Sequence, residues 1–173
     1  GGGSFSSRLM KVIRSEMGET YGISSGYRGG EHNGMFMLST FTSNEKLYRT
    51  MAVIKAELEK FALQGVTEEE IQYAKANRIG SYPLRFETLG GTASAITSGL
   101  RFRSLEEIEE YPLLVESLDR SNIEAAIAKH FHPSNFAIVL LGDPSVFDEV
   151  LDIALLYGIA PDQVDRIDWQ EIQ

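Results

Sequence analysis

Apolar residues at helical spacing open the chain, and a stretch of alternating side chains follows them. The first predicted helix carries five apolar residues on one face: Phe5, Leu9, Val12, Ile13 and Met17. Ser4 and Ser6 precede this face as candidate helix caps, and Gly18 is placed to end the helix. From Tyr21 onward the side chains recur with period two, which predicts a strand.

Two strands are predicted at residues 21–28 and 35–42, joined by a loop rich in glycine. Gly22, Ser24 and Gly26 leave one face of the first strand almost without side chains. Close packing of a helix against that face is the ordinary explanation for such residues. Room for a substrate backbone is the alternative.

The middle of the chain has the spacing of amphipathic helices. The longest predicted helix ends near Gly65, and five of its residues form a stripe typical of a core: Leu47, Met51, Ile54, Leu58 and Phe61. Helices are also predicted at residues 68–82, 121–131 and 146–157, and a small-residue helix within residues 90–99 is expected to pack closely on a neighbour. Four capping boxes mark helix starts: Thr42/Glu45, Thr67/Glu70, Ser104/Glu107 and Ser121/Glu124.

Two apolar stretches late in the chain predict further strands, at residues 136–141 and, more briefly, 164–167. The order of elements is then helix, two strands, a block of helices, strand and helix. This order indicates an α+β domain, in which an antiparallel sheet of about three to four strands is covered on one face by helices. We expect residues 1–173 to form a single domain.

Composition excludes several classes of function. The 173 residues include no cysteine, so disulfides, thiolate zinc sites and cysteine nucleophiles are excluded. The net charge of −9 argues against nucleic acid and anionic membranes as partners. No apolar run is long enough to span a bilayer.

Arg14 and Tyr21 are the most informative residues for chemistry. Arg14 falls in the last turn of the first predicted helix, and Tyr21 begins the strand that follows, so two strong hydrogen-bond donors are expected to converge at one edge of the fold. A structural explanation also exists, because an arginine in the last turn is favoured by the helix dipole and a tyrosine is common in strands. The surrounding residues favour the functional interpretation.

Those surroundings resemble the pitrilysin/insulinase family of zinc peptidases, which includes the mitochondrial processing peptidases. The residues that carry the resemblance are Gly1, Gly2, Gly3, Ser7, Arg8, Leu9, Ile13, Arg14, Gly18 and Tyr21. The segment from His132 to Asn135, with the apolar stretch and Gly142-Asp143 after it, is similar to the closing segment of the same domain. The resemblance is to the second, non-zinc domain type of the family.

The resemblance implies a role for Arg14 and Tyr21. In the family, an arginine and a tyrosine at this spacing contact the substrate backbone near the scissile bond, and the zinc ligands lie on a different domain. A guanidinium offers several donors to a carbonyl, and a phenol can donate to the oxygen that becomes negative as water attacks. Arg14 and Tyr21 are therefore the candidate catalytic and substrate-binding residues, acting on a peptide or protein substrate.

No zinc site is predicted in this chain. Its histidines are His32, His130 and His132, and none has the four-residue spacing that places two imidazoles on one helical face. We therefore expect no cofactor here and no peptidase activity from the chain alone. The zinc is expected on a partner domain or subunit of the same family.

The resemblance also implies that the chain is the C-terminal fragment of a longer polypeptide, truncated at its N-terminus, with one strand and one helix missing or supplied by another copy. It favours the bacterial periplasm as the compartment. Two other functions stay open. One is a catalytically inactive scaffold subunit of the same family, and the other is an unrelated module whose closed apolar pocket would bind a small ligand away from Arg14 and Tyr21.

Overall fold

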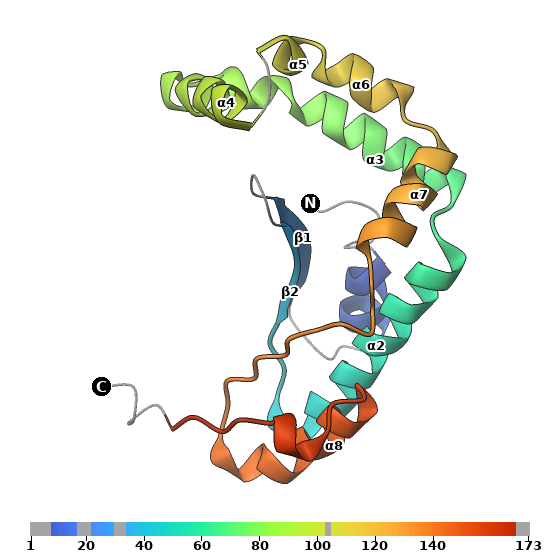
Figure 1. Cartoon of the computed structure of the whole chain (residues 1–173), viewed down its shortest axis with the longest axis vertical. Coiled ribbons are helices and arrows are strands. Elements are labelled where there is room, and N and C mark those ends of the chain that lie inside the picture. The colour runs from blue at the N-terminus through green and yellow to red at the C-terminus, as the bar shows by residue number, and fades with distance from the viewer. Residues whose placement is uncertain (1–7, 17–21, 30–33, 103–104, 169–173) are drawn as a thin grey trace.

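The computed structural model of the chain describes residues 8–16, 22–29, 34–102 and 105–168. Figure 1 shows an open arc, with helix α4 (Leu89–Phe102) at one end and helix α8 (Phe147–Leu156) at the other. A hairpin of two strands lies on the inner side of the arc, and the long helix α2 (Leu47–Gln64) forms much of its spine. This is a helix-rich α+β structure, as predicted from the order of elements.

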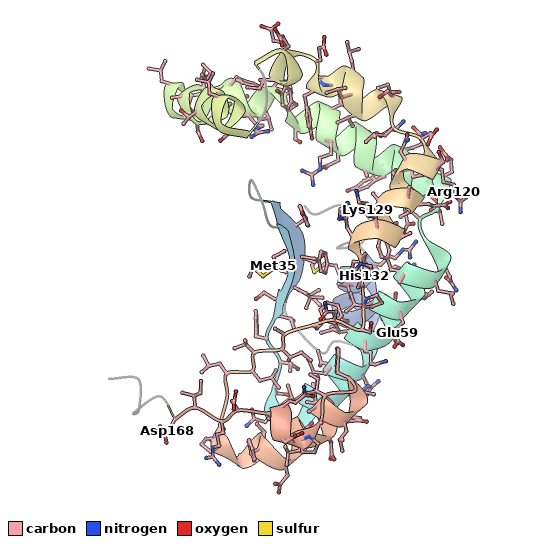
Figure 2. All side chains as sticks on the ribbon, in the orientation of Figure 1. Met35, Glu59, Arg120, Lys129, His132 and Asp168 are labelled. Atoms are coloured by element: carbon pink, nitrogen blue, oxygen red, sulfur yellow. The ribbon has the colours of Figure 1, made fainter. Side chains whose placement is uncertain are left out.

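The sheet consists of β1 (Ile23–Gly29) and β2 (Gly34–Thr40), which pair antiparallel from Ile23 opposite Thr40 to Gly29 opposite Gly34. One face of the hairpin turns toward the core through Ile23, which is buried, and through Phe36 and Leu38. The other face carries Met35 and Met37, both exposed. In Figure 2, Met35 lies on the side of the hairpin away from α2. Within the described residues, helices therefore pack on the core-facing side of the hairpin.

Beneath the hairpin lies the hydrophobic core, to which three other segments contribute. Leu9 and Ile13 have no exposed surface and fix the first helical segment, which continues as the π-helix η1 (Met10–Glu16), against the core. Ile54 of α2 and Ile153 of α8 complete the contact from the other side. The apolar stripe predicted for the longest helix is confirmed, since Met51, Ile54 and Leu58 are its buried apolar residues.

The chain then leaves this core along one arm of the arc (Figure 1). The arm contains α3 (Glu68–Ser81), the 3-10 helix η3 (Pro83–Phe86), α4, α5 (Leu105–Glu109) and α6 (Tyr111–Ser117). At Gly91 in α4, an added Cβ would lie 2.4 Å from the carbonyl oxygen of Arg85. The small-residue helix therefore packs closely on η3 at Gly91, whereas a Cβ added at Gly90 would meet no atom within 4 Å.

Helix α7 (Arg120–His130) returns the chain toward the core. The ring of Phe131, directly after α7, meets Phe36 and Phe61 edge to face, with centroid distances of 5.4 and 5.2 Å. After η4 (Pro144–Val146), α8 packs on α2, and the hydroxyl of Tyr157 donates to the carbonyl of Met51 at 2.9 Å. The short helix η5 (Pro161–Gln163) follows.

Within the described residues the sheet has two strands, so the prediction of three to four is not confirmed. Residues 136–141 and 164–167 form no strand, because no neighbouring strand pairs with them. Phe136 and Ile138 nevertheless pack against the core, so their predicted inward side chains are confirmed, whereas their pairing in the sheet is not.

Two further predictions need correction. Among the described residues, no atom other than immediate neighbours lies within 4 Å of a Cβ added at Gly22 or Gly26, so no described helix packs closely on β1 at these positions. The alternative of open room on this face agrees with the structure. Helix α7 is capped by Asp119, whose carboxylate accepts from the backbone amide of Asn122, because the helix begins before the predicted cap Ser121.

The other three capping boxes have different outcomes. The Thr67/Glu70 box is present at the start of α3. The short helix η2 (Asn44–Lys46) begins after Ser43 without a side-chain cap, so the Thr42/Glu45 box is not formed there. Ser104 lies outside the described residues, and its box stays a prediction.

Candidate functional site

Arg14 and Tyr21 are only partly covered by the structure. Arg14 belongs to η1 and directly follows the fully buried Ile13, so its backbone position is set by core packing. The side chain of Arg14 and all of Tyr21 lie outside the described residues. The convergence of the guanidinium and the phenol therefore stays a prediction.

A shallow pocket of about 320 Å³, largely open to solvent, lies where η1 meets the ends of β1 and β2. Its lining comes from three segments: Met10; Gly22, Ile23 and Ser24; and Ser39, Thr40 and Phe41. Met10 precedes Arg14 by four residues on the same helix, and Gly22 directly follows Tyr21. The pocket thus lies beside the two chain positions that the sequence singled out.

The pocket lies at the ends of β1 and β2, where few side chains cover the backbone. The hydroxyl of Thr40 donates to the carbonyl of Gly22 at 3.0 Å and ties the two strand ends together. A Cβ added at Gly22 would meet no atom within 4 Å, which leaves space over the backbone of β1. Met10 and the exposed Phe41 supply apolar walls, while Ser24 and Ser39 add hydroxyls. Such a surface suits an extended peptide with an apolar side chain.

Met10 and Phe41 were not recognised as site residues from the sequence. The available signal was the period of β2, because Met35, Met37 and Phe41 occupy alternate positions on the face away from the core. These apolar residues lie on the same face of the hairpin as Gly22, Ser24 and Gly26 of β1, and this face is turned away from the core. Apolar residues in that position mark a surface rather than a core. Met10 gave no comparable signal.

Arg8 anchors the segment that carries this site. Its guanidinium donates two hydrogen bonds to the carboxylate of Glu70 and one, at 3.1 Å, to the carbonyl of Gly65. The guanidinium also lies over the ring of Phe61, 5.7 Å from the centroid. The start of the helix that continues as η1 is thereby held to the junction of α2 and α3.

The electrostatics of this anchor are reciprocal. The hydrogen bonds from Arg8 lower the pKa of Glu70, and the hydrogen bonds to Glu70 raise the pKa of Arg8. Glu70 also accepts from the backbone amide of Thr67 at 2.8 Å, so one carboxylate joins the capping box of α3 to Arg8. Both side chains are about one-fifth exposed, at 20% and 19%.

The described residues do not form a zinc site. His130 ends α7 and His132 follows it, while His32 lies outside the described residues. In the part of the chain that the structure describes, no three His, Cys, Asp or Glu side chains are grouped to hold a metal ion. Figure 2 shows His132 and Glu59 as separate labelled side chains near the spine of the arc.

A second pocket of about 390 Å³ lies on the arm, away from η1. Tyr82, Phe86, Ile96, Ile108 and Glu109 line it. The ring of Tyr82 stacks on Tyr111, with centroids 4.5 Å apart, and its hydroxyl donates to the carbonyl of Ile108 at 2.5 Å. These contacts hold α3 to α5 and α6, so the aromatic groups have a structural role.

None of the helices among the described residues has the length and apolar character needed to cross a membrane.

The chain is similar to known proteins in sequence and in structure. Residues 1–78 match the family model described as the peptidase M16 inactive domain. The non-peptidase homolog YmxG of Helicobacter pylori is 36% identical over 90 residues, which cover 51% of this chain and 20% of that protein. The uncharacterized zinc protease YmxG of Bacillus subtilis is 25% identical over 142 residues, which cover 81% of this chain and 34% of that protein.

A solved structure agrees with the sequence matches. The crystal structure of a peptidase M16 inactive domain from Pseudomonas fluorescens has a TM-score of 0.67 and 26% identity, over 77% of this chain and 32% of that one. The chain spans between a fifth and about a third of the length of the curated relatives, at 20% and 34%. The predicted resemblance is confirmed: residues 1–78 match the peptidase M16 inactive domain, and the structure of the chain is similar to a solved domain of that description.

Proposed function

We propose that this chain is a substrate-binding, non-zinc domain of an M16 metallopeptidase, with Arg14 and Tyr21 as its functional residues. The observation that supports the proposal most directly is the pocket beside η1. It is lined by Met10, four residues before Arg14, and by Gly22, directly after Tyr21. A peptide held at this pocket would pass both residues.

In this proposal the zinc and the base that activates water belong to another domain or subunit of the family. The Arg14 guanidinium binds a substrate carbonyl and orients the peptide. The Tyr21 hydroxyl donates to the oxygen that gains negative charge during hydrolysis. The open face of β1 accepts the extended substrate backbone, because Gly22 and Gly26 present no side chain. We propose the bacterial periplasm as the compartment, on the family resemblance alone.

Kinetics of the assembled enzyme test the proposal. The chain is combined with the zinc-bearing M16 domain encoded with it or beside it, and peptide hydrolysis is measured for Arg14→Ala and Tyr21→Phe. Removal of one such donor should lower kcat about 10²–10³-fold. The melting temperature should not change. Arg78→Ala and Tyr73→Phe, both on the exposed surface of α3, are the matched controls and should leave kcat unchanged.

A catalytically inactive scaffold of the same family is the second candidate. The relative from Helicobacter pylori is named a non-peptidase homolog, which favours this alternative. A scaffold binds its partner subunit equally well with Arg14→Ala or Tyr21→Phe, and the assembly hydrolyses no peptide. Isothermal titration of the partner, run beside the kinetic assay, separates the two functions.

A further inference from the structure

The helical segment that carries Arg14 is held at its start by directional contacts. Leu9 and Ile13 of this segment have no exposed surface, so they fix which face of the helix meets the core. Apolar burial has no preferred direction and restrains a shift along the helix axis less sharply than hydrogen bonds do. Hydrogen bonds depend on distance and angle, and Arg8 supplies them. Arg8 therefore determines where the segment begins.

The guanidinium of Arg8 reaches two helix ends at once. It donates to both carboxylate oxygens of Glu70, in the first turn of α3, and to the carbonyl of Gly65, directly after α2, at 3.1 Å. The ring of Phe61 lies beside it, with its centroid 5.7 Å from the guanidinium carbon. A planar group with several fixed donors fits this set of partners, whereas the ammonium of a lysine does not.

The partners of Arg8 are themselves fixed by the fold. The Glu70 carboxylate also accepts from the backbone amide of Thr67 at 2.8 Å, which completes the capping box of α3. The amide of Gly65 donates to the carbonyl of Phe61 at 2.9 Å, and Leu58, earlier in α2, is buried in the core. The junction of α2 and α3 is thus a rigid reference for the position of Arg8.

The backbone from Arg8 to Arg14 is helical throughout, and from Met10 to Glu16 it forms the π-helix η1. π-helical turns are rare and occur frequently at functional sites. Their hydrogen bonds join residues i and i+5, so a turn takes more residues than in an α-helix. The direction in which a later side chain leaves the helix depends on this winding. A displaced or rewound start of the segment would therefore move Arg14.

We propose that Arg8 is a positioning residue, which places the Arg14 guanidinium at the substrate by fixing its helix to the junction of α2 and α3. This inference rests on the proposed function, in which Arg14 binds a substrate carbonyl. Arg8 acts through Arg14 and takes no part in the chemistry itself. A displacement of about 1 Å at a reacting group can lower a rate about 10²-fold, so loss of the anchor has a measurable effect.

Hydrogen exchange of the full chain tests the anchoring without any activity. Arg8→Lys keeps the charge and loses the planar fork. In this variant the backbone amides of residues 10–16 should exchange about 10–100-fold faster, because hydrogen bonds to a charged group are lost. Exchange in the middle of α2, around the buried Ile54, should stay unchanged. Arg120→Lys, in the exposed ion pair with Glu124, is the matched control and should change neither.

A double-mutant cycle in the assembled enzyme tests the link to Arg14. Arg8→Lys should lower kcat about 10–100-fold in the parent and have no further effect in Arg14→Ala, because Arg8 acts only through Arg14. Ile153→Val weakens the core away from the anchor and should leave kcat unchanged, which separates positioning from loss of stability. Glu70→Gln retains an acceptor for the helix cap and gives the same test if Arg8→Lys does not fold.

Two results overturn the inference alone. One is unchanged exchange of residues 10–16 in Arg8→Lys. The other is a kcat that Arg14→Ala lowers but Arg8→Lys leaves intact, or that Arg8→Lys lowers equally in the parent and in Arg14→Ala. An unchanged kcat in Arg14→Ala overturns the proposed function and the inference together, so the two failures are distinguished.

Discussion

The hairpin β1–β2 and the segment 136–141 both have alternating inward and outward side chains, but they adopt different structures. Both pack apolar residues on the same core. In the hairpin, a short loop brings a partner strand within reach, and seven residue pairs form, from Ile23 opposite Thr40 to Gly29 opposite Gly34. The later segment has the stronger strand composition but no neighbour within the described residues. A strand thus depends on its partner more than on its own propensity.

The largest expected difference between the two regions is in core packing. Ile23→Ala removes a side chain that is 6% exposed and should lower the free energy of unfolding by about 2–5 kcal/mol. Val139→Ala, at a 91% exposed position, should change it by less than about 0.5 kcal/mol. Urea denaturation at low protein concentration measures both. Equal losses would contradict the structural distinction.

A smaller effect is expected at the anchor that holds the first helical segment beneath the hairpin. Glu70→Gln weakens charge-assisted hydrogen bonds from Arg8 and should lower the free energy of unfolding by about 1.5–3 kcal/mol at neutral pH. Asn77→Asp, at an exposed position of the same helix, is the control of changed charge and should leave the free energy of unfolding nearly unchanged.

The pH dependence at Glu70 has a defined sign. The folded-state pKa is lowered from the ordinary 4.5, so the carboxylate contributes stability above that value and loses it as the pH falls through the folded-state pKa. Acidification below about pH 4.5 should therefore destabilise the parent chain more than Glu70→Gln. If the free energy of unfolding falls equally with decreasing pH in the parent chain and in Glu70→Gln, the anchor does not form.

A third effect concerns Tyr157, which packs against the same core as Phe136 and Ile138. Tyr157→Phe removes the hydrogen bond to Met51 and should cost about 1 kcal/mol. Burial, with a contribution from Glu59, raises the pKa of Tyr157 to about 12 from 10.0. Because the pKa is raised, the stability that protonated Tyr157 contributes is complete below pH 10.0 and is lost as the pH rises toward 12. This loss should be absent in Tyr157→Phe. Thermal unfolding across that pH range measures it.

The smallest effect is expected on the bare face of β1. Gly26→Ala adds a methyl group in open space and should change the free energy of unfolding by less than about 0.5 kcal/mol. If a helix packed there, overpacking would cost about 1–3 kcal/mol. Gly91→Ala, where the added Cβ would lie 2.4 Å from a carbonyl oxygen, is the matched variant that should be destabilised.

The candidate site was predictable in part. The helix that carries Arg14 and the strand after Tyr21 follow from local spacing, and η1 and β1 confirm both elements. The pocket between them was not predictable, because Met10, Gly22 and Phe41 come together only when the hairpin folds onto η1. The role of Arg8 was missed for the same reason, since its partner Glu70 is 62 residues away in the chain.

Local sequence by itself determined the helices, because periodicity, caps and glycines act within a few residues of each other. Thr67 begins α3 and Gly65 ends α2 in a positive-φ conformation, as their neighbours dictate. Tertiary structure alone decided which apolar segments became strands and which face of β1 stayed open. The physical reason is that strand hydrogen bonds need a second segment at a defined position, whereas a helix satisfies its own backbone.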